Sequence, residues 1–104
     1  MPTRYAPSTL TVLLLFAAAP CVQAQPDDAR ARDLAATCAN CHGTAGRTQP
    51  PVPALAGMRK GDIVQRMNEF RDGKRPATIM HQIAKGYTAE QVDAVAAWFE
   101  RQKP

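Results

Sequence analysis

Two cysteines and a histidine stand close together in the stretch Cys38-Ala39-Asn40-Cys41-His42, and such a group can bind a metal or attach a cofactor. Residues three apart on a helical turn lie on one face, so the sulfurs of Cys38 and Cys41 are expected to point the same way. The imidazole of His42 follows directly, where it can point toward the centre of whatever those sulfurs hold. A haem fits this pattern, because two thioethers can fasten the porphyrin edge while the imidazole binds iron.

Two other uses of a close cysteine pair have to be weighed. A thioredoxin-like redox pair needs a strand–turn–helix setting, and the sequence contains no strand of convincing length. A zinc site needs four ligands, and beyond this stretch only His81 remains as a candidate. We therefore predict one covalently bound haem c, with Cys38 and Cys41 as the attachment residues and His42 as an iron ligand.

The second axial ligand decides between an electron carrier and a catalyst. The candidates are Met58, Met67, Met80 and His81. Met67 lies on an apolar helical stripe, and Met58 has no pattern around it. Met80 is far enough from His42 for the chain to wrap round the porphyrin edge, so Met80 is the predicted ligand. His81 would face about a quarter-turn away from Met80 and is expected to be exposed, and bis-histidine ligation through it is the alternative. A thioether ligand raises the potential and leaves no open coordination site, which favours a carrier.

The first part of the chain reads as an export signal. Arg4 precedes an apolar run from Leu10 to Ala19. The small-residue pattern Val22-Gln23-Ala24 then predicts cleavage after Ala24. The run is about half of the roughly 20 residues that a spanning helix needs, so no stable membrane span is expected. We predict a signal peptide over residues 1–24, a monohaem domain over residues 25–104 and a periplasmic location.

The positions of the cysteines and the length of the domain agree with the division into a signal peptide and a monohaem domain. Of the three cysteines, Cys21 would leave with the signal or, in an alternative interpretation, carry a lipid. The remaining domain of about 80 residues can build only a marginal core, which usually needs a metal or a bound cofactor as a staple. A tethered haem would provide the missing apolar mass.

The predicted elements are helical. Asp62 with Gln65, and Thr88 with Gln91, each fit a capping box at a helix start. A loop rich in glycine and proline over residues 43–57 is expected to be ordered by the apolar anchors Val52, Leu55 and Met58. The predicted helices cover residues 27–38, 61–72, 77–85 and 89–102. The predicted fold class is therefore all-α, a bundle of short helices around one covalently attached haem.

With these residues in hand, the sequence resembles class I c-type cytochromes over nearly all of the mature chain. The stretch CANCHG resembles the attachment motif of that family, and PALAG resembles its Pro-x-Leu-x-Gly loop. The resemblance implies thioether roles for Cys38 and Cys41 and axial roles for His42 and Met80. It also implies that the carbonyl of Pro53 accepts a hydrogen bond from the proximal imidazole and so fixes its orientation.

The resemblance extends to the packing of the helices. In the family the first and last helices cross, and an aromatic residue of the last one packs there. Trp98 is the expected counterpart in this chain. The predicted last helix also carries an apolar stripe for the core, formed by Val92, Val95, Ala96 and Phe99.

A finer resemblance concerns the segment from Phe70 to Gln91. It is similar to cytochrome subunits of flavocytochrome c sulfide dehydrogenases and to related small periplasmic cytochromes, although His81 stands where those relatives often carry a small residue. The resemblance implies an electron carrier rather than an enzyme, either free or as the haem subunit of a flavin-linked sulfide dehydrogenase. The alternative function is a haem enzyme or gas sensor with an open distal site.

Basic residues are concentrated in the second half of the chain. Between positions 59 and 85, seven bases face three acids, a surplus of four positive charges. The surplus is either a solvated face or a patch that steers an acidic redox partner, with a flavoprotein subunit as one candidate. Nucleic acid is not an expected partner. The seven bases are Arg59, Lys60, Arg66, Arg71, Lys74, Arg75 and Lys85.

Overall fold

The computed structural model of the chain describes residues 1–3 and 26–104. Apart from its first three residues, the predicted signal peptide, Cys21 included, lies outside the described residues. The described elements are α1 (Pro26–Ala36), α2 (Ala39–His42), the 3-10 turn η1 (Thr44–Gly46), α3 (Lys60–Arg71), α4 (Met80–Lys85) and α5 (Ala89–Glu100). No strand occurs among these residues, so the predicted all-α class is confirmed.

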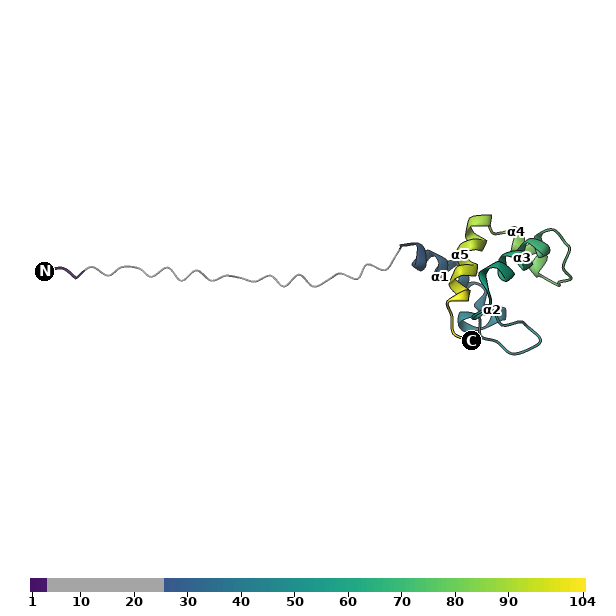
Figure 1. Cartoon of the computed structure of the whole chain (residues 1–104), viewed down its shortest axis with the longest axis horizontal. Coiled ribbons are helices and arrows are strands. Elements are labelled where there is room, and N and C mark those ends of the chain that lie inside the picture. Colours follow the sequence, from purple (N-terminus) through teal and green to yellow (C-terminus); the bar gives the residue numbers. More distant parts are fainter. Residues whose placement is uncertain (4–25) are drawn as a thin grey trace.

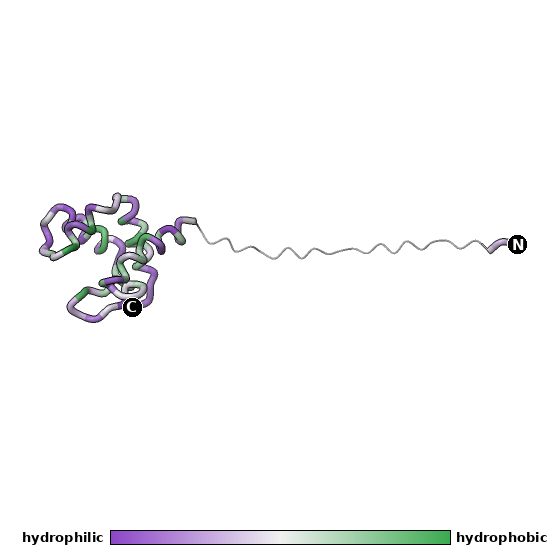
Figure 2. The backbone as a smooth tube through the Cα atoms, turned by 180° about the vertical axis from the view of Figure 1, so that it is seen from behind, coloured by the Kyte–Doolittle hydropathy of each residue, from purple (hydrophilic) through white to green (hydrophobic). Residues whose placement is uncertain are grey.

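Three helices meet to form the core. Helix α5 packs against α1 and α3, and α3 also packs against α4, while the C-terminus lies near α2 (Figure 1). The buried cluster at this meeting point consists of Ala35, Ile63, Val95, Ala96 and Phe99. Hydrophobic and hydrophilic stretches alternate along the helical part of the chain (Figure 2), as expected for helices with one buried face.

None of the helices in the described part of the chain combines the length and the apolar character needed to cross a bilayer.

The apolar stripe predicted for α5 is confirmed, because all four of its residues are buried. Phe99 is 1% exposed and is the largest fully buried side chain. Trp98 is half-buried and packs edge-on against Phe99, with ring centroids 5.0 Å apart. Trp98 packs against the buried cluster that contains Phe99, and its expected place at the crossing of the first and last helices stays a prediction.

The first helix ends earlier than predicted. It was expected to run into Cys38, but α1 stops at Ala36 and a two-residue turn precedes α2. In this turn the hydroxyl of Thr37 donates to Leu34 O at 3.1 Å, and Cys38 N donates to Ala35 O at 3.0 Å. A threonine side chain that bonds to nearby backbone competes with continued helix, which accounts for the break.

The start of α3 is also different from the prediction. The helix begins at Lys60, so Asp62 lies inside the first turn and forms no capping box. Instead, Asp62 binds the guanidinium of Arg59, with Nε to Oδ2 at 2.9 Å. The backbone N–H of Lys60, which has no partner within the helix, donates to Glu100 Oε1 at 2.9 Å, so a side chain of α5 satisfies the start of α3.

The capping box predicted for α5 is confirmed. Gln91 N donates to Thr88 Oγ1 at 3.2 Å, and Thr88 N donates to Gln91 Oε1 at 2.9 Å. These reciprocal bonds satisfy two N–H groups that the helix itself leaves without partners. They fix the position at which the chain enters the helix that carries most of the core.

Thr88→Ala is expected to lower the free energy of unfolding by about 1 kcal/mol, the usual cost of losing a side-chain cap. Urea denaturation of the haem-loaded protein, followed by far-UV circular dichroism, measures this loss. Thr88→Ser is the control, since serine keeps the hydroxyl and should stay close to wild type. Equal losses in both variants would contradict the assignment of the cap.

Candidate functional site

The two cysteines and the histidine lie on one short helical turn. Cys38 precedes α2, and the N–H groups of Cys41 and His42 both donate to its carbonyl, at 3.3 Å and 2.8 Å. Cys38 is half-buried and packs against the core cluster, whereas Cys41 is exposed; both thiols are free. We call residues 38–42 the attachment turn. One of its cysteines is packed against the core, and the other is exposed to solvent.

Glycine is required where this turn ends. Gly43 has a φ of +78°, a conformation that residues with a side chain rarely adopt. A Cβ placed there would collide with the backbone carbonyl of Arg47. Gly43 therefore makes a sharp turn directly after His42, which leads the chain into η1 and the loop that follows.

The imidazole of His42 is held by the proline-rich loop. Its Nδ1 lies 2.7 Å from the carbonyl oxygen of Pro53. A carbonyl can only accept a hydrogen bond, so Nδ1 carries the proton and donates it. In the neutral ring the other nitrogen, Nε2, then holds a free lone pair, which is the form that binds a metal. This is the contact that the resemblance implied for Pro53.

The loop itself is fixed by backbone contacts and by two apolar anchors. The N–H groups of Leu55 and Ala56 both donate to Gly46 O, at 2.8 Å and 3.2 Å. The side chains of Leu55 and Met58 pack against the core cluster, as expected, whereas Val52 is not among the described residues that do so. These contacts hold the loop beside the attachment turn on both sides of its bond to His42.

The donor chemistry of this turn fits a covalent haem c. It offers two free thiols and one imidazole whose bonded Nδ1 leaves Nε2 available. Burial raises the pKa of the Cys38 thiol above its ordinary value of 9.0, against the lowering effect of a hydrogen bond with Thr37. Within the described part of the chain, no three His, Cys, Asp or Glu side chains are grouped closely enough to hold a metal ion.

The methionines of the domain differ in their surroundings. Met58 and Met67 are half-buried and pack against the core cluster. Met80 is also half-buried and is the first residue of α4, but it is not among the side chains that pack against that cluster in the described residues. Of these three methionines, Met80 is therefore the one that the core does not engage.

His81 was expected to be exposed, and this expectation is wrong. The side chain is half-buried, and its Nε2 lies 2.6 Å from the carbonyl oxygen of Arg75. Its ring also meets Phe70 edge-on, with centroids 6.3 Å apart. Because the carbonyl can only accept, Nε2 of His81 carries the proton and donates it, and in the neutral ring the lone pair lies on Nδ1. The bis-histidine alternative would therefore have to use Nδ1 of His81.

Sequence reasoning missed two residues that join distant parts of the site. Arg71 donates to Tyr87 O at 2.8 Å and to Ala84 O at 3.4 Å, which ties α3 to the end of α4. The hydroxyl of Tyr87 lies 2.7 Å from that of Thr37, next to the attachment turn. No local pattern announces these contacts, because the partners lie 13 to 50 residues apart.

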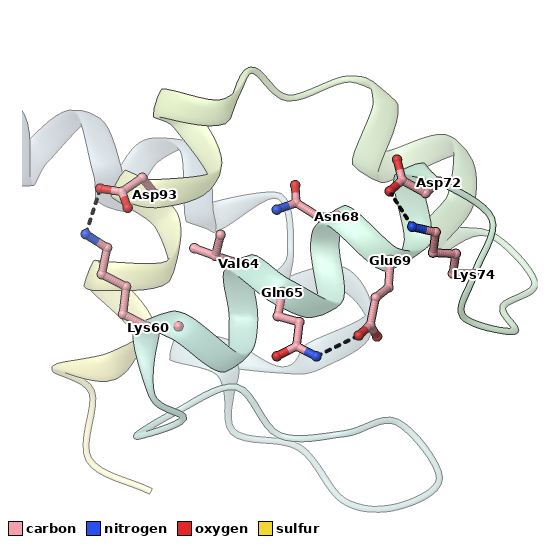
Figure 3. A pocket seen from close by; sticks show the side chains of 9 residues that line it. Lys60, Val64, Gln65, Asn68, Glu69, Asp72, Lys74 and Asp93 are labelled. Atoms are coloured by element: carbon pink, nitrogen blue, oxygen red, sulfur yellow. Dashed lines mark hydrogen bonds and ion pairs between the residues drawn. The ribbon is translucent and has the colours of Figure 1, made fainter.

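Most of the concentrated bases are engaged in ion pairs or hydrogen bonds. Lys60 binds Asp93 at 2.7 Å and Lys74 lies 3.6 Å from Asp72, on either side of an open pocket along α3 (Figure 3). Arg59 pairs with Asp62, and Arg75 with Glu69. Arg71 binds two carbonyls instead. These ion pairs do not change the formal net charge of the chain, which is +4. The protein therefore keeps a positive electrostatic field that acts over a long range.

Glu69 gives this network a dependence on pH. Hydrogen bonds from Gln65 and then Arg75 hold its pKa below the ordinary value of 4.5, and the charge of Arg66 adds to the effect. A carboxyl whose pKa is lowered by folding stabilises the protein above its ordinary pKa, and that contribution disappears as pH falls through the folded value.

Glu69→Gln is therefore expected to lower the urea midpoint at pH 7. The difference from wild type should shrink as pH falls below the ordinary value of 4.5 and through the lowered pKa of the folded carboxyl, because the wild-type carboxyl is then protonated. Urea titrations of both haem-loaded proteins between pH 7 and pH 3 measure this change. A difference that stays constant across the whole range would contradict the prediction.

Comparison with known proteins decides the family. A family model described as "Cytochrome c" matches residues 29–103. The chain belongs to the cytochrome c family. Membership confirms the predicted resemblance, implies a covalently bound haem c and supports electron transfer through that haem.

Several relatives are longer than this chain. Cytochrome c-552 of Acidithiobacillus ferridurans is 46% identical over 61 residues, which cover 59% of this chain and 26% of the relative. The cytochrome subunit of sulfide dehydrogenase of Chlorobaculum tepidum is 35% identical over 72 residues, covering 69% and 66%. The thiosulfate dehydrogenase electron acceptor of Thiomonas intermedia is 34% identical, with 100% of this chain matched to 46% of the relative.

A solved structure shares the fold. The cytochrome c4 of Acidithiobacillus ferrooxidans superposes with a TM-score of 0.62 and 37% identity, over 69% of this chain and 49% of that one. The predicted cytochrome c-like bundle is thus confirmed, and the present chain spans about half of this neighbour.

Proposed function

We propose that the domain over residues 25–104 is a periplasmic single-electron carrier that holds one haem c. Cys38 and Cys41 form the thioethers, and His42 and Met80 bind the iron from opposite sides. The observation that carries this proposal is the 2.7 Å contact between His42 Nδ1 and Pro53 O, because it presents Nε2 as a free ligand beside two free thiols. A bound haem iron supplies one-electron chemistry by cycling between its ferric and ferrous states.

Each of the residues that would hold the haem has a separate role in this proposal. The thioethers of Cys38 and Cys41 keep the cofactor on a domain whose own core is small. The carbonyl of Pro53 orients the ring of His42 and raises its basicity as a ligand. Met80 closes the other side, so that small molecules find no vacant coordination position.

Three measurements on protein matured in cells with a haem-attachment system test this function. The mass is expected to show cleavage after Ala24 and one added porphyrin. Acidified acetone is expected to leave the pigment on the polypeptide, and the ferric spectrum is expected to show the weak long-wavelength band of methionine-bound iron. Pigment released into the acetone would refute covalent attachment. Ready binding of carbon monoxide to the ferrous protein would favour the alternative, a haem enzyme or gas sensor with an open distal site.

A second, more specific role is that of electron acceptor for a dehydrogenase of reduced sulfur compounds, with a flavoprotein subunit as the donor. Its support is the similarity to the sulfide dehydrogenase subunit and to the thiosulfate dehydrogenase electron acceptor. The positive net charge would raise the rate of encounter with an acidic partner. The test is reduction of the ferric protein by sulfide in the presence and absence of a flavoprotein subunit. Reduction that needs the flavoprotein and slows with added salt supports this role; equal rates with and without it contradict the role.

A further inference from the structure

The segment that leads into Met80 has few contacts of its own. Residues 76–79 connect α3 and its following turn to α4 without helical structure. Within residues 26–104, residues 76–78 take part in no backbone–backbone hydrogen bond of a turn or cap. Ile79, which directly precedes Met80, is 57% exposed. Something other than the backbone of this segment must therefore hold the start of α4 in place.

One end of this segment is firmly attached to α3. The backbone N–H of Arg75 donates to Glu69 O at 3.3 Å, and its guanidinium binds the carboxylate of Glu69 at 2.7 Å. Glu69 is held in turn by Gln65 at 2.8 Å. The guanidinium of Arg75 also lies over the ring of Phe70, 5.8 Å from its centroid. The carbonyl of Arg75 is thus a fixed point relative to α3.

His81 connects that fixed point to the first turn of α4. Its Nε2 donates to the Arg75 carbonyl at 2.6 Å, and its ring packs edge-on against Phe70. The hydrogen bond spans six residues and closes the segment 76–80 into a loop with both ends held. His81 directly follows Met80 in α4, so whatever fixes one backbone position restrains the other.

We propose that His81 is a positioning residue for Met80: its hydrogen bond to Arg75 O holds the methionine segment against α3 and limits the release of the Met80 sulfur from iron. This inference rests on the proposed role of Met80 as the axial ligand. It gives a physical task to the histidine at position 81, which acts through its contact with Arg75 and does not itself bind the iron.

The test compares two amides of different reach in the ferric haem protein. Glutamine at position 81 places its N–H near the position of the histidine Nε2, whereas asparagine ends short of the carbonyl. We expect His81→Asn to raise the apparent affinity for added cyanide, which must displace Met80, about fivefold, the factor that one net hydrogen bond contributes. His81→Gln is expected to stay near wild type. Gln82→Asn shortens an exposed amide at the neighbouring position and is the matched control, with no expected change.

A second readout separates positioning from general stability. In His81→Asn, the long-wavelength band of methionine-bound iron is expected to disappear at a lower urea concentration than the helical circular dichroism signal. In wild type and His81→Gln, the urea midpoints of the band and of the circular dichroism signal should lie closer together. Equal shifts of both midpoints, or wild-type cyanide affinity in His81→Asn, would overturn the role of His81 while leaving Met80 as the ligand. A wild-type protein without the band would overturn the ligand assignment and this inference with it.

Discussion

Met80→Leu is expected to lower the reduction potential of the haem by an amount on the order of 0.2 V, a quarter of the roughly 0.8 V range that axial ligands command. The physical reason is the loss of a soft thioether, which favours ferrous over ferric iron. Leucine has nearly the same volume as methionine, so the substitution removes the sulfur with little effect on packing. Redox titration of the purified haem protein, followed by its visible spectrum, measures the change.

The environment of the methionines explains why this effect should belong to position 80 alone. Met58 and Met67 pack against the buried cluster, where a thioether behaves as a flexible apolar filler. Met80 begins a short helix outside that cluster. The side chain that the core leaves unused is the one available to a cofactor.

Met67→Leu is the matched control for this experiment, because it makes the same chemical change on a methionine in contact with the core. It is expected to keep both the potential and the long-wavelength band. Met80→Leu should also acquire the ability to bind carbon monoxide when reduced, since an apolar side chain leaves the iron without a sixth ligand. An unchanged potential in Met80→Leu, or a large fall in Met67→Leu, would show that a different residue binds the iron.

The features of this chain that sequence reasoning predicted are local ones. The attachment turn places its chemistry within five consecutive residues, so the spacing of Cys38, Cys41 and His42 carries the information by itself. The capping box of Thr88 and Gln91 is likewise a contact between residues three apart. The contact of Pro53 with His42 came from the resemblance to a family, since nothing in the spacing of the two residues requires it.

The features that were missed depend on tertiary contacts. Asp62 looked like a partner in a capping box, but the carboxylate that satisfies the start of α3 is that of Glu100, 40 residues from Lys60. His81 looked like a surface residue, because its partner is a backbone carbonyl and a carbonyl has no signature in sequence. Helix starts and polar contacts of this kind are set by which elements meet, and that is decided by the fold as a whole.

Phe99→Ala is expected to lower the free energy of unfolding by about 3–5 kcal/mol, the usual cost of removing a fully buried aromatic ring. Marginally stable domains have only about 5–15 kcal/mol in total, so much of the stability would be lost. Phe99 is 1% exposed, and two of its four partners in the buried cluster are alanines, which cannot expand to fill the space. Urea denaturation of the haem protein measures the loss.

The same substitution should also weaken the hydrogen bond between His42 and the loop that carries Pro53. The ring of Phe99 lies against Gly46, at a spacing so close that a Cβ there would come within 2.9 Å of it. The carbonyl of Gly46 holds the loop that carries Pro53, and the carbonyl of Phe99 accepts from Gly57 at 2.9 Å at the far end of that loop. The Nδ1 proton of His42, observed by nuclear magnetic resonance, is therefore expected to exchange with solvent faster in Phe99→Ala.

Two comparisons decide whether burial of this ring is the cause. Trp98→Ala removes a larger but half-buried neighbour and is expected to cost clearly less than Phe99→Ala, because stability follows the area removed from water and the cavity left behind. Gly46→Ala should be less harmful in the Phe99→Ala background than in wild type, since the clash with the ring is gone, while the clash with the backbone nitrogen of Ala56 and the strain of a φ of +77° remain. Two results would contradict the claim that the packed ring of Phe99 holds this loop against α5. One is a larger loss of stability in Trp98→Ala than in Phe99→Ala, and the other is simple additivity of the substitutions at positions 46 and 99.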